Sequence, residues 1–240
     1  MPSGERSVSS DGQLLSGQVD YYRERAEEYD DWFYRRDRYD FGDDHRKRWF
    51  SEAQEVRTAL AKAVPCGNVL ELACGTGIWT RELVRSASRV VAVDTSPEVV
   101  EVNRRRLGEA PGEASVEYVI ADIFEWQPTT TFDLVFFGFW LSHVPPSRFE
   151  SFWTKVRTSL RPGASVFFLD SADRREYGRL DTKPREDDSW VVRRNLKDGR
   201  EFDIVKIFYE PTALTDRLRA LGWEGRVQQT EQFFIYGQFR

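Results

Sequence analysis

The sequence contains few of the residues that build metal centres or disulfide frameworks. Its 240 residues include two cysteines, Cys66 and Cys74, and two histidines. It has no Cys-x-x-Cys pair and no histidine spaced to complete a zinc site with these cysteines. We therefore expect two reduced thiols.

Long apolar runs and an excess of basic charge are also missing. No apolar stretch approaches the roughly 20 residues that span a bilayer. The polar start MPSGERSVSSDG lacks the apolar core of a secretory signal. We therefore expect a cytoplasmic protein without a membrane partner, either a monomer or a homodimer. The formal charge of −5 offers no field for a polyanion, which argues against nucleic acid as a partner.

What the sequence does have is an alternation of apolar runs, typical of strands, with amphipathic segments, typical of helices. The expected strands are residues 69–73, 89–93, 116–120, 132–138, 164–170, 202–209 and 232–239. The expected helices are residues 19–35, 46–64, 77–87, 97–107 and 146–160, with one more beginning at Pro211. This order is typical of a parallel sheet covered on both faces.

We expect one domain, residues 18–240, with additions around the sheet. Its predicted parts are a mobile N-terminus at 1–17, a helical cap at 18–64, a cofactor-binding core at 65–170, a substrate-side insertion at 171–201 and a C-terminal part of the sheet at 202–240. Within the insertion, LKDGR indicates a hairpin turn with Val191–Asn195 as one arm.

A strand-like apolar run ends in a glycine-rich turn within VLELACGTGIWT. Ligands of doubly wound sheets bind beyond the carboxyl ends of the strands, so this turn is a candidate ligand loop. A dinucleotide fingerprint requires a third glycine, but Thr80 occupies that position. Instead, Glu71, Ala73, Gly75 and Gly77 form an acid followed by alternating small residues.

This pattern resembles the first motif of class I S-adenosylmethionine-dependent methyltransferases, with Ala73 in place of the first glycine. The resemblance continues where VVAVD ends at Asp94, followed by Thr95, and where the next strand leads to Asp122 and Ile123. It implies an α/β fold with a Rossmann-like, doubly wound, mostly parallel seven-stranded sheet whose last strand is antiparallel. It also implies that Asp94 accepts from the ribose hydroxyls, that Asp122 accepts from the adenine amine and that Ile123 packs on the ring.

Aromatic residues supply further candidates for the cofactor and substrate sites. Tyr22 and Tyr29 share one face of the first helix and either cap the cofactor or simply form the buried face of that helix. Phe137, in the fourth strand, and Trp79 join the cofactor candidates. Trp49 is a candidate for the substrate wall.

Few side chains are available to remove a proton from a methyl acceptor. His143 follows the fourth strand in SHVPP, where this fold presents groups toward the methyl, and it is the expected base. Asp170 ends the next strand and is a candidate to orient His143, bind a substrate hydroxyl or help hold Mg²⁺; a simple cap is equally open. No Asp/Asp/Asn magnesium set is evident, so metal dependence stays open.

Three longer segments resemble actinobacterial small-molecule O-methyltransferases, including phosphonate and methylmannose-polysaccharide types: GQVDYYRERAEEYDDWF, FWLSHVPPSRFESFW and VVRRNLKDGREFDIVKIFYEPTALTDRLRALGW. The resemblance implies transfer to a hydroxyl or acidic oxygen of a polar small molecule or oligosaccharide. Arg174, Arg193 and Arg194 are natural receptors for a phosphonate or carboxylate, although charge clusters are more often solvated. Carboxylate or N-methyl transfer is the alternative, followed by a Rossmann oxidoreductase or a noncatalytic cofactor-binding subunit.

Overall fold

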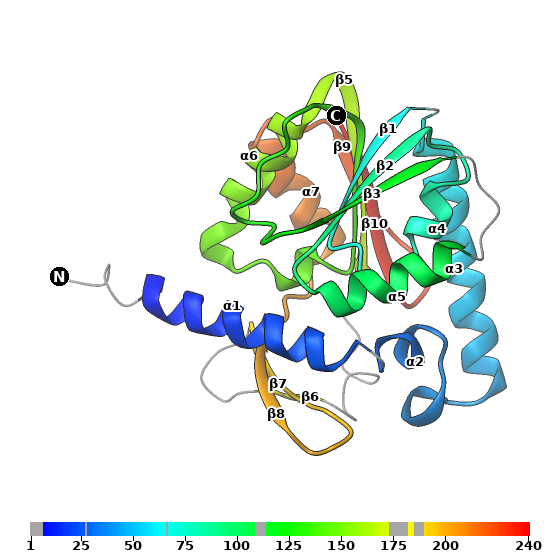
Figure 1. Ribbon diagram of the computed structural model, residues 1–240, viewed down its shortest axis with the longest axis vertical. Coiled ribbons are helices and arrows are strands. Elements are labelled where there is room, and N and C mark those ends of the chain that lie inside the picture. Colours follow the sequence, from blue (N-terminus) through cyan, green and yellow to red (C-terminus); the bar gives the residue numbers. More distant parts are fainter. Residues whose placement is uncertain (1–6, 27, 66, 109–113, 173–181, 185–189) are drawn as a thin grey trace.

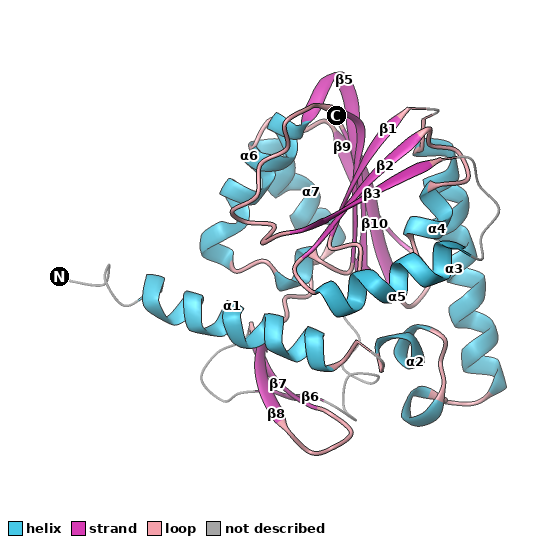
Figure 2. Ribbon diagram, in the orientation of Figure 1, coloured by secondary structure: helices cyan, strands magenta, loops and turns pink. Residues whose placement is uncertain are grey.

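The structure, a computed structural model, describes residues 7–26, 28–65, 67–108, 114–172, 182–184 and 190–240. A seven-stranded sheet runs through its middle, and a smaller sheet lies beside the N-terminal helix (Figures 1 and 2). In spatial order the large sheet contains β3 (Ser115–Ile120), β2 (Arg89–Asp94), β1 (Asn68–Leu72), β4 (Phe132–Gly138), β5 (Leu160–Ser171), β10 (Phe234–Phe239) and β9 (Gly225–Gln229). The first five strands in this order (β3, β2, β1, β4 and β5) pair in parallel, whereas β10 runs antiparallel to both of its neighbours. The predicted Rossmann-like fold with an antiparallel last strand is confirmed.

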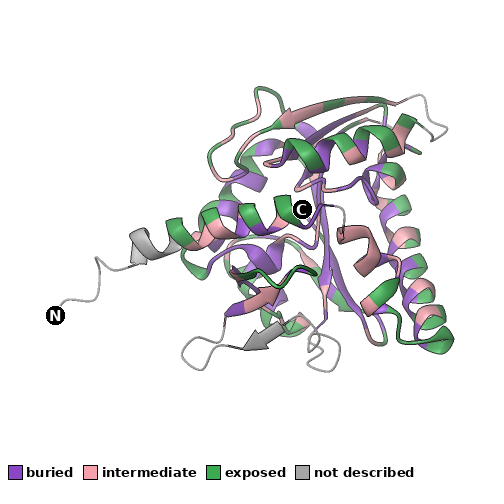
Figure 3. Ribbon diagram, turned by 60° about the horizontal axis from the view of Figure 1, so that its bottom comes forward, coloured by how far each residue is buried: buried purple, intermediate pink, exposed green. Residues whose placement is uncertain are grey.

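The central strands are nearly continuous apolar runs because helices cover both faces of the sheet. On β1, every residue after Asn68 is buried. One face is covered by α3 (Asp43–Ala63), α4 (Thr80–Leu83) and α5 (Pro97–Gly108), and the other by α6 (Phe149–Ser159) and α7 (Pro211–Ala220) (Figure 1). Figure 3 shows buried strands and helices that turn one exposed face to solvent. In the described part of the chain, no helix is both long enough and apolar enough to cross a membrane.

The N-terminal cap differs from the single helix predicted at 19–35. Helix α1 (Ser7–Glu24) begins and ends earlier, and a turn separates it from α2 (Tyr29–Phe33). In α2, the carboxylate of Asp30 accepts a hydrogen bond from the hydroxyl of Thr76 at 2.7 Å. The bend therefore brings α2 against the glycine-rich turn, a tertiary contact that helical periodicity does not reveal. The mobility expected of the first residues stays a prediction.

Residues 202–209 do not join the large sheet, contrary to the prediction. Strand β8 (Glu201–Val205) instead pairs antiparallel with β7 (Val191–Asn195), which pairs with β6 (Thr182–Pro184). The predicted LKDGR hairpin is confirmed by this pairing. The remaining place in the large sheet belongs to β9, which was not predicted because only its Val227 is buried and its sequence GRVQQ contains no apolar run.

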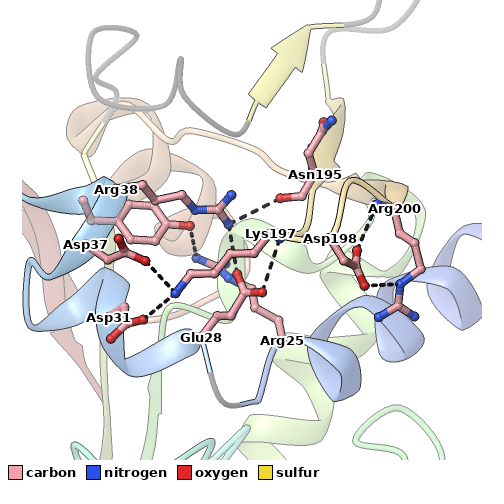
Figure 4. A network of polar contacts seen from close by, with 10 residues as sticks. Arg25, Glu28, Asp31, Asp37, Arg38, Asn195, Lys197, Asp198 and Arg200 are labelled. Atoms are coloured by element: carbon pink, nitrogen blue, oxygen red, sulfur yellow. Dashed lines mark hydrogen bonds and ion pairs between the residues drawn. The ribbon is translucent and has the colours of Figure 1, made fainter.

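Charged side chains tie the β7–β8 turn to the N-terminal cap (Figure 4). Lys197 Nζ lies 3.0 Å from the carboxylate of Asp31 and 2.7 Å from that of Asp37, in the short helix η1 (Asp37–Tyr39). The guanidinium of Arg200 lies 2.8 Å from the carboxylate of Glu24. Water screens each pair, so each contributes little alone. As a network, they connect the cap with the small sheet that lies beside it.

Gly77 provides a stability test of the glycine-rich turn. It has a φ of 86°, and an added Cβ would clash with buried Asn103, which donates to the Gly75 carbonyl at 3.2 Å and to the Thr80 hydroxyl at 2.9 Å. We expect Gly77→Ala to lower the free energy of unfolding by about 2–4 kcal/mol, because backbone strain and overpacking add. Gly163→Ala is the matched control for strain alone, since Gly163 has a φ of 79° and open space around it. If thermal unfolding shows that Gly77→Ala and Gly163→Ala lose equal free energy of unfolding, the overpacking contribution is contradicted.

Candidate functional site

Two adjoining cavities lie beyond the carboxyl ends of the parallel strands, beside the N-terminal cap. The first has a volume of about 440 Å³ and is bounded by α1, the ends of β2 and β4, and the loops after β1 and β3. The predicted cofactor residues that line it are Tyr22, Tyr29, Ala73, Gly75, Asp94, Thr95 and Asp122. The structure thus brings residues from five separate segments to one cavity, at the position where this class of sheet binds ligands.

The glycine-rich turn has left-handed backbone at three alternate residues. The φ angles are 54° at Ala73, 54° at Gly75 and 86° at Gly77. A left-handed conformation costs a residue with a Cβ roughly 1–2 kcal/mol. Ala73 therefore keeps, at some cost, the backbone shape that a glycine adopts freely. The turn is held from behind by the buried side chain of Asn103, which donates to the carbonyl of Gly75.

Asp94, at the end of β2, is fixed by the backbone of the same turn. Its Oδ2 accepts from the N–H of Gly75 at 2.9 Å, and its Oδ1 accepts from the N–H of Ser96 at 3.1 Å. Burial raises the pKa of this carboxyl, and the backbone hydrogen bonds oppose that rise. A carboxylate has about four acceptor positions, so both oxygens can accept further bonds from a ligand. This geometry suits a diol.

Asp122 begins a tight turn after β3 that lines the same cavity. Its Oδ1 accepts from the N–H of Phe124 at 2.7 Å, and its carbonyl accepts from the N–H of Trp126 at 2.8 Å. Phe124 and Glu125 also line the cavity. Ile123, which was expected to pack on the adenine ring, is buried in the core on the α6 side instead. The apolar ring that reaches the cavity is Phe124, one residue later.

The structure does not bring four further cofactor candidates to the cavity surface, contrary to expectation: Glu71, Gly77, Trp79 and Phe137. Phe137 packs against Phe152, with ring centres 5.2 Å apart, because alternate residues of β4 face opposite sides of the sheet. Trp79 packs against Phe33 on the other side. Burial raises the pKa of Glu71 to about 8. These residues lie behind the cavity wall.

A second cavity, of about 100 Å³, adjoins the first, and Tyr22, Tyr29, Phe139 and His143 line both. One part of its wall is aromatic and includes Trp49, the predicted substrate residue. Its basic lining residues are Arg25, Arg35, Arg194 and Lys206. Among the described residues, no carboxylate lines this cavity. The charged residues described in the lining of the second cavity are therefore all basic, and none of them is among the residues that it shares with the first.

His143, in the short helix η2 (Leu141–His143), is held at the junction in one tautomer. Its Nδ1 lies 2.6 Å from the carbonyl oxygen of Val205 and must donate to it, since a carbonyl only accepts. The Nε2 of the neutral ring is then the acceptor, and the hydroxyl of Tyr22 donates to it at 2.7 Å. Burial lowers the pKa of His143 well below 6.5, and the positive charge of Lys206 lowers it further. The imidazole is therefore neutral at physiological pH.

Asp170 ends β5 but lines neither cavity and has no hydrogen bond with His143 among the described residues. Its carboxylate accepts from the N–H of Ser142 at 2.8 Å and lies 3.4 Å from Lys206 Nζ. It thus orients the loop that contains His143 through the backbone of the preceding residue. Among the described ranges, no group of three or more His, Cys, Asp or Glu residues is placed to hold a metal ion.

The predicted arginines of the insertion separate into different positions. Arg194 lines the second cavity. Arg193, its neighbour on β7, projects to the other side of the strand and pairs with Asp203 of β8 at 2.9 Å. Arg174 lies outside the residues that the structure describes.

Three basic residues of the second cavity were missed by sequence reasoning: Arg25, Arg35 and Lys206. Lys206 interrupts the apolar run of DIVKIF, and both arginines lie among the aromatic residues of the cap. A charged residue within an apolar segment is seldom buried without a partner or a function. The position of each of these three residues in the sequence could therefore have marked it as a candidate. The guanidinium of Arg35 lies 3.3 Å from the ring centre of Trp49, which places it against the aromatic wall.

The carboxylate of Asp94 provides a test of the first cavity. We expect Asp94→Ala to weaken the binding of S-adenosylhomocysteine at least about tenfold, because each charge-assisted hydrogen bond contributes about 1.5–3 kcal/mol. Isothermal titration calorimetry measures the affinity, and Asp198→Ala, in the exposed β7–β8 turn, is the control. Unchanged affinity in Asp94→Ala would remove this residue from the site. Binding of NADH in place of S-adenosylhomocysteine would overturn the cofactor assignment.

Comparisons with known proteins identify relatives of the central part of the chain. A methyltransferase domain family matches residues 69–163. The chain is 28% identical over 133 residues to nodulation protein S of Rhizobium tropici, a match that covers 55% of this chain and 51% of that protein. It is 30% identical over 157 residues to the cypemycin N-terminal methyltransferase of a Streptomyces species, which covers 61% of each. The chain thus spans about half the length of the nodulation protein.

Solved structures extend the similarity to nearly the whole chain. The protein in the DhpI–SAM–HEP and DhpI–SAH complexes is 38% identical in sequence to this chain, and each match covers 95% of this chain. The matches cover 97% and 96% of the DhpI chains, with TM-scores of 0.76 and 0.74. The N-methyltransferase NodS of Bradyrhizobium japonicum, solved with S-adenosylhomocysteine, is 16% identical with a TM-score of 0.59 and shows the fold alone. Because DhpI is 38% identical and the match covers nearly the whole of both chains, this chain belongs to the class I S-adenosylmethionine-dependent methyltransferases.

Proposed function

We propose that the protein methylates an oxygen of a small acidic molecule, and that a phosphonate is the favoured class of acceptor. The observation that carries this proposal is the second cavity, which adjoins the cofactor cavity and is lined by Arg25, Arg35, Arg194 and Lys206. Guanidinium forks match the oxygens of phosphonates and carboxylates, and an ammonium adds a compact positive charge. The relative DhpI has been solved as a complex with both SAM and HEP, which supports a site for a second small molecule in addition to the cofactor.

The size of the second cavity favours a small acceptor over an oligosaccharide. One water needs roughly 10–15 Å³ of such volume. A cavity of about 100 Å³ is therefore several times the minimum that one water needs, which is the scale of a small molecule. A short phosphonate or hydroxy acid suits that volume better than a methylated mannoside oligosaccharide does. A mass-shift screen of phosphonates, hydroxy acids and mannosides with S-adenosylmethionine tests this ranking. Methylation of a carboxylate in that screen would favour the alternative, carboxylate methyl transfer.

The residues of the site would hold the acceptor and exclude water during transfer. S-Adenosylmethionine supplies an activated methyl group, and transfer forms an oxygen–carbon bond as the carbon–sulfur bond breaks. The basic side chains would bind the oxygens that are not methylated and thereby orient the one that is. The rings of Trp32, Trp49 and Phe139 line the cavity and would keep water from the reacting oxygen.

The role of His143 depends on the charge of the acceptor oxygen. A hydroxyl must lose a proton, and the neutral Nε2 of His143 is a suitable acceptor, directly or through the hydroxyl of Tyr22. An oxygen that is already ionised has no proton to lose, so His143 would then position Tyr22 at the junction of the cavities. The basic lining of the second cavity favours an ionised acceptor and therefore the positioning role.

Arg194 and Arg193 form a matched pair for testing the acceptor site. We expect Arg194→Met to raise the KM for an acidic acceptor about 10–100-fold, because charge-assisted hydrogen bonds to its oxygens are lost. Affinity for S-adenosylhomocysteine should stay within about twofold of wild type. Arg193→Met, which removes an arginine that lines neither cavity, should leave both constants unchanged. Equal effects of the two substitutions on KM would contradict the proposal.

The lowered pKa of His143 predicts the pH dependence of turnover. The ring gains a proton only as the pH falls below its lowered pKa, so it is already neutral above pH 6.5. We therefore expect the ratio of wild-type to His143→Asn kcat, both measured at saturation, to be constant between about pH 6.5 and 9. Ionisation of the acceptor affects wild type and variant alike, so its effect on kcat cancels in the ratio.

The size of that ratio then separates the two roles of His143. A fall in kcat of about 10²–10⁴ in the variant identifies the base. A defect confined to KM identifies a positioning residue and leaves methyl transfer intact. A ratio that climbs steadily with pH over this range would contradict a ring that is neutral throughout.

A further inference from the structure

Lys155 is a buried lysine of α6 to which the proposed chemistry gives no task. It lies three residues after Phe152, on the helix face that packs into the core, and only 9% of the residue is exposed. Burial of an ammonium is costly unless hydrogen bonds replace its hydration. The partners of this side chain therefore indicate why it is there.

Three backbone carbonyls accept from the ammonium of Lys155. Its Nζ lies 2.8 Å from the carbonyl oxygen of Ile123, 2.6 Å from that of Phe124 and 2.7 Å from that of Trp126. An ammonium has three donors and no acceptor, so these bonds satisfy it completely. All three carbonyls belong to the turn that begins at Asp122.

That turn forms one wall of the cofactor cavity. It contributes Asp122, Phe124 and Glu125 to the lining. Three carbonyls that converge on one atom of α6 fix the backbone of the turn, because none can rotate away without leaving a donor of Lys155 unpaired. The direction of the Asp122 carboxylate and of the Phe124 ring follows from that backbone.

We propose that Lys155 is a positioning residue for the adenine end of the cofactor, which clamps the turn so that Asp122 accepts from the exocyclic amine. The proposal rests on cofactor binding in the first cavity and deepens it. A methionine at this position would supply no donor. A planar guanidinium would not direct three donors from a single nitrogen, so arginine is an imperfect replacement.

The test compares S-adenosylhomocysteine with S-inosylhomocysteine, in which a carbonyl oxygen replaces the exocyclic amine. We expect wild-type protein to prefer the first about 10–100-fold by calorimetry, because the second places an acceptor against the acceptor Asp122. Lys155→Met should weaken S-adenosylhomocysteine binding and reduce the preference to below about threefold. Lys62→Met, an exposed lysine in the last turn of α3, is the control and should retain the full preference.

The preference, rather than affinity alone, decides the outcome. A purely structural role would weaken both ligands equally, so a wild-type preference in Lys155→Met overturns the proposal. If Asp122→Asn abolishes the preference while Lys155→Met retains it, the adenine site stands and only the clamp fails. Wild-type protein that binds both ligands equally overturns the adenine site and the clamp together. If Lys155→Met does not fold, Lys155→Arg is measured instead. We expect its preference for S-adenosylhomocysteine to fall at least about threefold, and an unchanged preference would overturn the proposal.

Discussion

Parallel pairing of β1 with both β2 and β4 is the constraint on which both cavities depend. In this register, Leu72 of β1 lies opposite Val93 of β2 and Phe137 of β4, so the three strands end together. The turn after β1 therefore meets the end of β2, where the N–H of Gly75 donates to Asp94 at 2.9 Å. The loop after β4 and the end of β5 reach the same edge. Polar residues that are distant in the chain become neighbours because parallel strands share one direction.

Charged groups at this edge are buried, and their pairing sets the character of the site. The carboxylate of Asp170 accepts from the N–H of Ser142 and lies 3.4 Å from Lys206, whose Nζ donates to the hydroxyl of Ser142 at 2.8 Å. Either charge alone would cost several kcal/mol in this environment. The arrangement fixes the loop that contains His143 and places Lys206 in the wall of the second cavity. A requirement of folding thus also determines where positive charge lies.

The parts of the fold that sequence could predict are those encoded by local pattern. Strands β1, β2, β4, β5 and β10 contain apolar runs and β3 has the alternating sequence SVEYVI, and Asp94 and Asp122 were found because each stands at the end of a predicted strand. By contrast, β9 buries only Val227 and has no such pattern. The break between α1 and α2 also has no local pattern of this kind, and the hydrogen bond of Asp30 in α2 with Thr76 joins residues that are distant in the chain. The basic cluster of the second cavity was only partly found, because it forms when the cap and the small sheet fold over the same edge.

The two cavities differ in charge, and methyl transfer between them would exploit that difference. Four acids and two arginines line the first, whereas the charged residues described in the lining of the second are all basic. A sulfonium therefore suits the first cavity and an ionised oxygen the second, with the uncharged Tyr22 and His143 at the junction. If the acceptor oxygen is ionised, as proposed, transfer would convert the sulfonium into a neutral thioether and remove one negative charge from the acceptor. Because charges are poorly solvated in a site that excludes water, their mutual loss favours the forward step. The products would have one positive and one negative charge fewer than the reactants, so the electrostatic attraction that assembles the complex would hold the products less strongly once the methyl has moved.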